Sequence, residues 1–275
     1  METNKIYQGD CLELMKQIED KSIDLVVTSP PYDNLRDYKG YSFDFEGIAR
    51  ELFRILKEGG VIVWVVNDAT IDNSKTGTSF KQALFFKQLG FNFHDTMIYA
   101  KKNAQPNSQS KRYNSRFEYV FIFSKGIPKT FNPLKKFKEC EDKRKRKPTQ
   151  RRKDGKMIVK NVRSNDWVKL GNIWFYATGG GNTTKDDFAF EHPAMFPEKL
   201  AEDHILTWSN KEDIVLDPMC GAGTTCKMAK LNLRNFIGID ISEEYCKIAR
   251  KRIEQNTLFQ TTQLNSEGKF FSSQP

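Results

Sequence analysis

Short apolar runs alternate with amphipathic segments along most of the chain. Seven of these runs are rich in β-branched and aromatic residues and have the length of strands. They span residues 5–9, 23–28, 61–66, 93–100, 117–123, 213–217 and 235–240. Five further segments space their apolar residues along one face of a helix. These segments are 47–60, 79–89, 197–208, 224–231 and 242–253. Alternating strands and helices are typical of an α/β fold whose largely parallel sheet is covered on both faces.

Two details of this pattern concern the boundaries of elements. The helix predicted for 47–60 includes Leu56 on its apolar face and ends at a pair of glycines. The runs 93–100 and 117–123 are joined by a polar loop that contains no glycine. These two runs are therefore predicted to form an antiparallel hairpin at the edge of the sheet.

The alternation breaks down between Lys125 and Phe190, where the sequence is basic and contains Gly, Asn and Pro. Residues 101–160 hold 20 Lys or Arg against 5 Asp or Glu, a local net charge of +15, whereas the rest of the chain sums to −6. The run KRKRKPTQRRK at 143–153 has eight basic residues in eleven. Such a run favours a polyanionic partner and is predicted to be too repulsive to fold without a counter-charge. A solvated loop without a partner is the alternative.

Composition narrows the class of protein further. A chain of 275 residues can bury one good core plus a smaller lobe. The five cysteines contain no CxxC pair, so neither a zinc site nor a disulfide scaffold is favoured, and a cytoplasmic protein with reduced thiols is the default. No apolar stretch approaches the roughly 20 residues that span a bilayer, and the polar start lacks the apolar region of a signal peptide. Residues 257–275 are predicted to be a poorly ordered tail.

The later of two distinctive loops, DPMCGAGTT, follows a predicted strand that ends at Asp217. Gly221 and Gly223 permit a tight turn, and a threonine can cap the next helix. A second strand ends about twenty residues beyond at Asp240, where a carboxylate can accept hydrogen bonds from both ribose hydroxyls. The spacing suits a cofactor that contains a nucleoside, and the missing Gly-Lys-Ser/Thr ending disfavours a phosphate loop.

The earlier loop, TSPPY, follows the predicted strand 23–28. Two prolines fix the backbone and leave carbonyl oxygens without neighbouring amide donors, so these oxygens can accept hydrogen bonds from an amino group. Tyr32 can stack on a planar base, which contributes on the order of 1 to 3 kcal/mol. The alternative is a rigid Pro-Pro turn with Tyr32 packed in the core.

Together, TSPPY and DPMCGAGTT resemble the two characteristic motifs of DNA amino-methyltransferases, which methylate an exocyclic base nitrogen with S-adenosyl-L-methionine. The catalytic motif precedes the cofactor motif, with an insertion between them, as in the β-class. Three more segments are similar to family motifs and lie in family order: GDCLELM, RFEYVFIFSKG and HPAMFPEKL. The resemblance covers about 190 residues. It implies a circularly permuted Rossmann-like fold with a mostly parallel seven-stranded sheet, an antiparallel edge hairpin and a small basic target-recognition insertion.

The resemblance also implies how the chain is divided. Residues 1–125 correspond to the catalytic part of the methyltransferase domain, and 126–190 to the target-recognition insertion. Residues 191–256 correspond to the cofactor-binding part of the same domain, followed by the tail 257–275. Within the insertion, Trp167, Trp174 and Asn172 either read bases or form a small core, and core is the favoured role for the tryptophans.

Catalytic roles carry over by motif position. The Ser29 side chain and the Pro30 carbonyl would accept from the target amino group, Pro31 holds the turn, and Tyr32 would stack on the extruded base. Residues implied to bind the cofactor are Asp10, Cys11, Thr28, His192, Pro193, Phe196, Asp217, Pro218, Gly221, Gly223, Thr224 and Asp240. Many relatives have Lys-Pro where this chain has Phe196 and Pro197, which leaves open how the methionine carboxylate is held. A lone histidine such as His192 is otherwise most often structural.

Double-stranded DNA is the partner that the resemblance implies, and a cognate restriction endonuclease is left open, as is the oligomeric state. Residues expected to contact DNA are Arg36, Lys143, Arg144, Lys145, Arg146, Arg151 and Arg152. Asn34 and Arg36 reach DNA or fold over the cofactor, or else belong to a plain surface loop. In the family, Ser at the first position of the catalytic motif is associated with cytosine N4, and Asp or Asn with adenine N6.

Ser29 therefore favours cytosine N4, with adenine N6 as the alternative. No metal is implied, and the mechanism needs no catalytic cysteine. Two alternatives of other classes stay open. One is a DNA-binding protein of the same fold that has lost methyl transfer. The other is methylation of RNA or of a protein amide.

Overall fold

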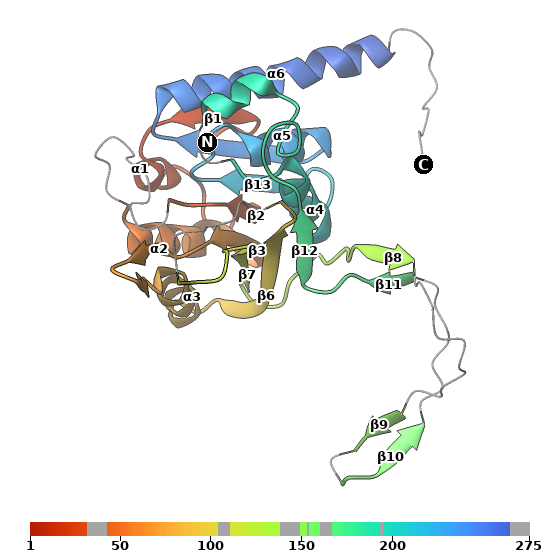
Figure 1. Ribbon diagram of the computed structural model, residues 1–275. Coiled ribbons are helices and arrows are strands. Elements are labelled where there is room, and N and C mark those ends of the chain that lie inside the picture. The colour runs from red at the N-terminus through yellow and green to blue at the C-terminus, as the bar shows by residue number, and fades with distance from the viewer. Residues whose placement is uncertain are drawn as a thin grey trace. The chain divides into compact units, whose positions relative to one another are not determined.

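The computed structural model describes residues 1–31, 43–103, 111–137, 149–152, 154–159, 167–192 and 195–264. The chain divides into two compact units. The larger comprises Met1–Asn132 and Asn172–Pro275, and the smaller comprises Pro133–Gly171 (Figure 1).

The larger unit is built around an eight-stranded sheet with the order β1-β14-β13-β2-β3-β7-β6-β12. Its strands are β1 (Lys5–Gln8), β2 (Ile23–Thr28), β3 (Leu56–Val66), β6 (Asn92–Lys101), β7 (Phe117–Ser124), β12 (Ile173–Tyr176), β13 (Ile214–Asp217) and β14 (Asn235–Asp240). Among these, β7 alone is antiparallel to its neighbours. A further two-stranded ribbon pairs β4 (Thr70–Ile71) with β5 (Ser74–Lys75). The predicted α/β fold with a mostly parallel sheet is confirmed.

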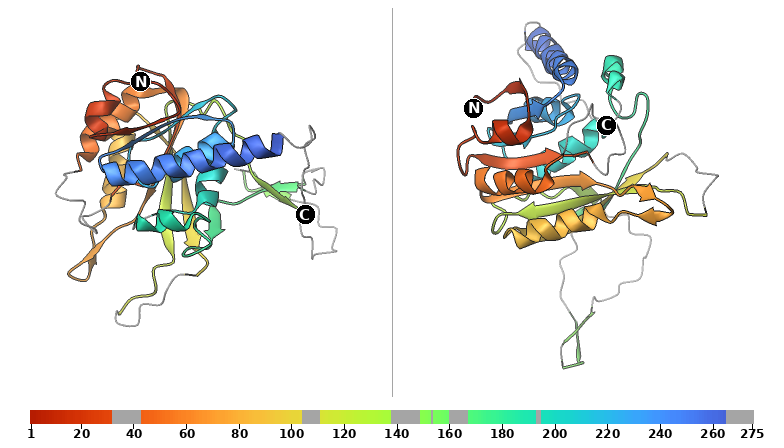
Figure 2. Two further views of the ribbon diagram at one scale, coloured as in Figure 1. Left: turned by 90° about the horizontal axis from the view of Figure 1, so that it is seen from above. Right: turned by 90° about the vertical axis from the view of Figure 1, so that its left-hand side faces the viewer.

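Helices cover both faces of this sheet (Figure 2). One face packs against α1 (Cys11–Met15), α2 (Phe45–Ile55) and α3 (Thr78–Gln88), and the other against α4 (Glu198–Trp208), α5 (Thr224–Leu231) and α6 (Glu243–Leu264). The two hydrophobic cores lie between these layers, with Trp64 and Phe86 fully buried in the first and Val63 and Ile205 in the second. A short 3-10 helix, η1 (Asp187–Glu191), precedes α4. No helix in the described ranges is long and apolar enough to cross a membrane.

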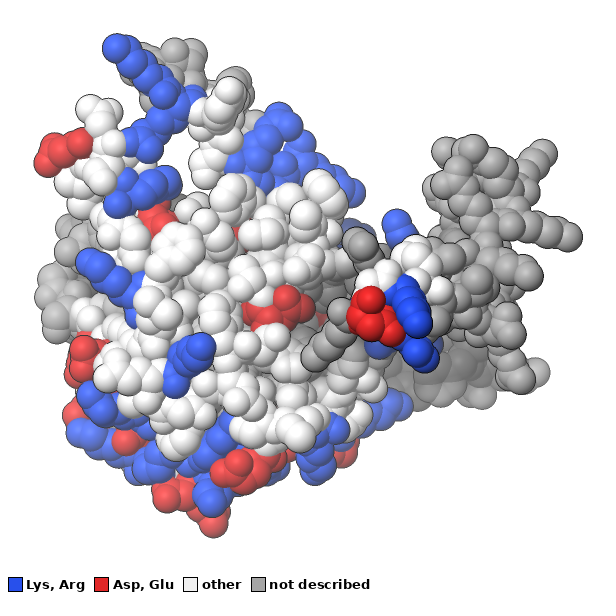
Figure 3. Space-filling view, turned by 90° about the horizontal axis from the view of Figure 1, so that it is seen from below, with Lys and Arg blue, Asp and Glu red and all other residues white. Residues whose placement is uncertain are grey.

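The predicted hairpin exists as β6 and β7, but it does not form the edge of the sheet. Parallel pairing of Ile173 with Ile98 adds β12 outside β6, so the sheet has eight strands rather than seven. The sequence of β12, IWFY, is rich in strand-forming residues, but it lies in the basic segment that was predicted to be an insertion outside the sheet. Its residues Ile173 and Phe175 face outward and are 54% and 61% exposed. Seen from below, the larger unit shows a broad area with few charged side chains (Figure 3).

The helix predicted for 47–60 is too long. It ends at Ile55, and β3 begins at Leu56. Pairing decides the boundary, because the Gly59 N–H donates to the Lys125 carbonyl (2.6 Å) and the Gly59 carbonyl accepts from the Lys129 N–H (2.9 Å). Lys125 also caps the helix by donating from Nζ to the Phe53 carbonyl (2.6 Å). At the other end of the chain, α6 continues to Leu264, through part of the segment predicted as tail.

The smaller unit is narrower than the predicted insertion 126–190. Its flanks belong to the larger unit, since 126–132 pairs with Gly59 and 172–176 joins the sheet as β12. The smaller unit contains two antiparallel ribbons, one of β8 (Lys135–Phe137) with β11 (Trp167–Lys169), the other of β9 (Thr149–Arg151) with β10 (Met157–Val159).

Part of the basic run 143–153 is thus folded in the structure, contrary to the prediction. An Asp154–Gly155 turn allows this, because Asp154 Oδ1 accepts from the Lys156 N–H and Gly155 has φ +83°. The two tryptophans do not form a small core of the insertion as predicted: Trp174 lies in β12, packs on the core of the larger unit and stacks on His204. Trp167 is 53% exposed and contacts Phe137.

Candidate active site

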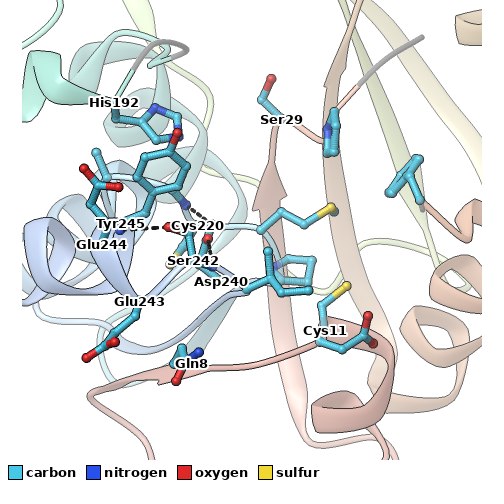
Figure 4. Close-up of a pocket in the computed structure, with 18 of the residues that line it drawn as sticks. Gln8, Cys11, Ser29, His192, Cys220, Asp240, Ser242, Glu243, Glu244 and Tyr245 are labelled. Atoms are coloured by element: carbon cyan, nitrogen blue, oxygen red, sulfur yellow. Dashed lines mark hydrogen bonds between the residues drawn. The ribbon is translucent and has the colours of Figure 1, made fainter. Parts of the chain in front are cut away.

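The two loops singled out in the sequence, TSPPY and DPMCGAGTT, meet where the carboxyl ends of the parallel strands lie. Strands β1, β14, β13 and β2 are parallel neighbours, so their carboxyl ends lie side by side. The loops after these strands enclose a cavity of about 910 Å³. Figure 4 shows Ser29 at the end of β2 facing this space, with His192 and Tyr245 across from it. Residues 189 positions apart, Thr28 and Asp217, are brought into direct contact at this edge.

Most of the described residues that were predicted to bind substrate or cofactor line this cavity. They are Asp10, Cys11, Ser29, Pro31, His192, Phe196, Pro218, Gly221, Thr224 and Asp240. Four others do not line it: Thr28, Pro30, Asp217 and Gly223. The remaining predictions fall outside what the structure describes, namely Tyr32, Asn34, Arg36, Pro193, Lys143, Arg144, Lys145, Arg146 and the side chain of Arg151. Arg152 is exposed in the smaller unit.

Asp240 is held rigidly at the end of β14. Its Oδ2 accepts from the Gly221 N–H (2.8 Å) and its Oδ1 from the Ser242 N–H (2.9 Å). Burial raises the pKa of Asp240, although both hydrogen bonds oppose this shift. Each carboxylate oxygen keeps a further lone pair, so Asp240 can still accept hydrogen bonds from a ligand in the cavity.

Gly221 is required by both space and backbone. Its φ is +49°, and a Cβ atom there would lie 2.6 Å from His192 Nε2. His192 has little room to retreat because its ring packs against Tyr245, with centroids 4.3 Å apart. The close approach of His192 to the loop brings segments from before and after β13 together at the cavity.

Gly223 does not line the cavity but allows two helices to pack closely. It begins α5 with φ +75°, and a Cβ atom there would lie 2.7 Å from Ala249 Cβ on α6. This glycine therefore permits the close contact between α5 and α6. The predicted glycine pair thus divides into one residue on the cavity and one between helices.

Asp10 and Cys11 occupy the start of α1. Asp10 Oδ1 accepts from the Glu13 N–H (3.1 Å), so the carboxylate caps the helix while lining the cavity. Burial raises the pKa of the Cys11 thiol to about 12, which keeps it protonated and unreactive at neutral pH.

Among the charged side chains that line the cavity, acidic ones greatly outnumber basic ones, a feature that the sequence motifs alone did not indicate. The carboxylates are Asp10, Glu13, Asp44, Asp240, Glu243 and Glu244, and Lys247 is the one Lys or Arg among the described lining residues. Clustered carboxylates favour a ligand that carries positive charge. Other lining residues not predicted from the sequence include Phe43, Met195, Met219, Ser242 and Tyr245. The run DISEEY after β14 was an available signal for the last two.

Asp217 lies behind the loop and supports it. Its Oδ1 accepts from Thr28 Oγ1 (2.8 Å) and from the Met219 N–H (3.2 Å), and its side chain is buried. Burial raises the pKa of this carboxyl to about 6, against the lowering effect of its hydrogen bonds. The folded chain therefore binds this proton more tightly than the unfolded chain between about pH 4 and pH 6.

We expect Asp217→Asn to remove a pH dependence of stability. Without ligand, the contribution of Asp217 to the free energy of unfolding should fall as the pH rises from 4 to 6 and stay lower above. The variant should lack this contribution and keep only the pH dependence of other groups, such as Asp240, whose pKa burial also raises. The pKa of Asp217 is raised by about two units, and one unit corresponds to 1.36 kcal/mol, so the ionised carboxyl costs the folded state about 3 kcal/mol at pH 7. The variant should be more stable than wild type at pH 7 by up to this amount. Urea unfolding at several pH values measures this. Asp72→Asn, an exposed carboxyl in the β4–β5 turn, is the control and should keep the wild-type slope. An equal slope in Asp217→Asn would contradict the prediction.

Comparison with known families matches residues 23–251 to the profile described as DNA methylase, which covers the N6 and N4 methyltransferases. The chain belongs to this family of DNA amino-methyltransferases. A relative in Bacillus amyloliquefaciens, the orphan methyltransferase M.BamHII, is 54% identical over 246 residues, which are 88% of this chain and 92% of that protein. The type II methyltransferase M.SmaI of Serratia marcescens is 27% identical and matches 90% of each chain.

Solved structures agree on the fold. The PvuII DNA methyltransferase (cytosine-N4-specific) superimposes with a TM-score of 0.66 at 21% identity, covering 95% of this chain and 93% of that one. Matches of this kind confirm the methyltransferase fold expected from the two motifs.

Proposed function

We propose that this chain transfers a methyl group from S-adenosyl-L-methionine to the N4 amino group of a cytosine flipped out of double-stranded DNA. The observation that carries the proposal is that Ser29 and the cofactor loop line one cavity at the carboxyl edge of the sheet. Family membership supports DNA as the substrate and an exocyclic amine as the acceptor.

The cavity has the groups that this cofactor requires. Asp240 has free lone pairs for the ribose hydroxyls, and Asp10 lies at the end of β1 where an adenine amine would be met. The carboxylates on the wall suit the positive sulfonium and ammonium groups. When bound, the cofactor supplies an electrophilic methyl group. Gly221, His192 and Phe196 would line its methionine end, and a structural histidine remains the alternative for His192.

Ser29 and Pro30 would activate the acceptor. An exocyclic amine is a poor nucleophile because its lone pair is delocalised into the ring. Hydrogen bonds from the amine to the Ser29 hydroxyl and to the Pro30 carbonyl would draw its protons out of plane and localise that lone pair. Direct attack on the methyl group then needs no covalent enzyme intermediate, and preorganised acceptors provide most of the rate enhancement. The contact with the Pro30 carbonyl stays a prediction, since Pro30 does not line the cavity, and so does stacking of the base on Tyr32.

The basic run 143–153 would contact the DNA backbone. Flipping a base costs a few kcal/mol, and phosphate contacts by residues such as Lys143 and Arg152 can offset this cost. Binding should then weaken steeply as salt rises. Cytoplasmic location and a restriction endonuclease partner remain predictions of the same proposal.

Ser29 is the reason for preferring cytosine N4 over adenine N6. The test is to incubate the purified protein with methyl-labelled cofactor and genomic DNA and to digest the DNA to nucleosides. Label should appear in N4-methylcytosine. Label in methyladenine alone would overturn the choice of base but keep the reaction class.

A protein that binds DNA but neither binds the cofactor in a calorimetric titration nor labels DNA would instead be an inactive member of the fold. Label transferred to RNA or protein in preference to DNA, in a competition assay, would overturn the choice of substrate.

A further inference from the structure

Arg252 on α6 is fully buried, with a side chain that is 0% exposed, and it lies behind the cavity rather than in it. Its guanidinium reaches groups on several segments that surround the cavity. Helix α6 runs beside α5, the helix that follows the cofactor loop (Figure 1).

One side of the guanidinium holds the cofactor loop. Nη1 donates to the Ala222 carbonyl (2.7 Å) and to Thr224 Oγ1 (3.1 Å). Both Ala222 and Thr224 line the cavity. The buried arginine therefore holds two wall residues from behind.

The other side holds the ends of the segment that carries His192 and Phe196. Nε donates to Asp186 Oδ2 (2.9 Å), which precedes that segment, and Nη2 donates to Glu198 Oε1 (2.5 Å), which follows it. Within the segment, Met195 Sδ lies 3.9 Å from Nη1 and also lines the cavity. One rigid group thus spans the two walls that meet where Gly221 touches His192.

The charges in this cluster balance. Lys227 Nζ donates to the same two carboxylates at 2.7 Å each, so two cations face Asp186 and Glu198. Burial acts to raise the pKa of Asp186, but hydrogen bonds from Lys227 and Arg252 outweigh it and hold this pKa below its ordinary value. Lys227 neutralises the two carboxylates, whereas Arg252 donates both to these carboxylates and to the cofactor loop.

We propose that Arg252 is a positioning residue for cofactor binding: it sets the distance between the cofactor loop and the His192–Phe196 segment. The planar guanidinium presents five N–H donors in a fixed fork. A lysine would keep the charge, but its single ammonium cannot reach the Ala222 carbonyl and both carboxylates in this arrangement. The inference rests on the proposed function, since it takes S-adenosylmethionine as the ligand.

The experiment compares Arg252→Lys with Arg234→Lys. Arg234 is a matched control, because it is also buried (9% exposed) and donates to the Ser209 carbonyl (2.6 Å) and to Ser209 Oγ (3.0 Å). Arg234 immediately precedes β14 and so lies at the amino end of this strand, whereas Asp240 lies at its carboxyl end. For each full-length protein, the dissociation constant of S-adenosylmethionine is measured by calorimetry and the midpoint of thermal unfolding by circular dichroism.

Both variants should unfold at a lower temperature than wild type, but Arg252→Lys alone should weaken cofactor binding, by about tenfold. Its KM for the cofactor should rise in proportion, with a smaller change in kcat. Equal affinities in wild type and a folded Arg252→Lys would overturn the positioning role. So would an equal loss of affinity in Arg234→Lys, because general loosening of the fold would then explain it. If wild type itself binds no cofactor, the proposed function fails instead.

Should Arg252→Lys fail to fold, Thr184→Val removes a neutral contact of the guanidinium, from Nη2 to Thr184 Oγ1 (3.3 Å), at a residue that does not line the cavity. It should raise the dissociation constant severalfold in a protein that stays folded. An unchanged dissociation constant in this folded variant would count against the positioning role.

Discussion

Ser29→Ala should lower kcat by about a factor of 10² to 10³, the range observed when one preorganised hydrogen-bonding group is removed from an active site. The side chain stands at the end of β2 and faces the cavity, where the target amine would donate to it. Alanine keeps the backbone and the neighbouring Pro30 carbonyl but cannot accept this bond. Single-turnover methyl transfer with saturating cofactor and DNA measures the rate of the chemical step.

The control is Ser22→Ala. Ser22 immediately precedes β2, so it lies at the amino end of the strand that Ser29 follows, and its hydroxyl donates to the Glu19 carbonyl (2.7 Å). This variant should retain wild-type kcat. In Ser29→Ala the dissociation constant of the cofactor should stay within about twofold of wild type, because the cofactor loop is untouched. A wild-type rate in Ser29→Ala would remove Ser29 from the mechanism and with it the argument for cytosine.

Gly221→Ala should abolish most cofactor binding, with an affinity loss of about 100-fold. A left-handed conformation costs a non-glycine residue about 1 to 2 kcal/mol, and the new Cβ atom would meet His192 Nε2 at 2.6 Å. The loop and His192 must then move apart. Displacement of the loop also strains the hydrogen bond from the Gly221 N–H to Asp240, the proposed ribose ligand. Calorimetric titration with S-adenosylmethionine gives the affinity.

Gly180→Ala is the matched control for this substitution. Gly180 has no atom within 4 Å of its potential Cβ position and no positive φ, so alanine fits there without strain. Its cofactor affinity should equal that of wild type. Binding by Gly221→Ala within a few fold of wild type would show that the ligand does not approach this turn.

Much of the fold could be read from the chain because the signals were local. All seven predicted strands and all five predicted helices exist, although α2 ends at Ile55 rather than at residue 60 and α6 continues past Ile253 to Leu264. The two loops were recognisable for the same reason. Each follows a predicted strand, and in the cofactor loop the glycine turn is followed about twenty residues later by an acidic residue at the end of the next strand. Pro30 and Pro31 restrict the backbone wherever they occur.

Other features depended on partners that are distant in the chain. Leu56 belongs to a strand rather than to α2 because Gly59 pairs with Lys125. The strand β12 joins the sheet because it pairs in parallel with β6, where Ile173 lies opposite Ile98. Its own sequence does not alternate between apolar and polar residues. Neither outcome follows from propensity, which tertiary pairing readily overrides.

By itself, the sequence determined the α/β class, the chemistry of the two loops and the resemblance to a methyltransferase family, since each is encoded in short contiguous segments. The tertiary structure alone decided which motif residues reach the cavity. In the folded chain, Asp217 and Gly223 support the loop from behind, whereas Asp240 and Gly221 line the cavity. Arg252 lies behind both the loop and the His192–Phe196 segment. The physical reason is that the direction a side chain faces at a strand end depends on the neighbouring strands and helices, and these are contributed by residues up to about two hundred positions away.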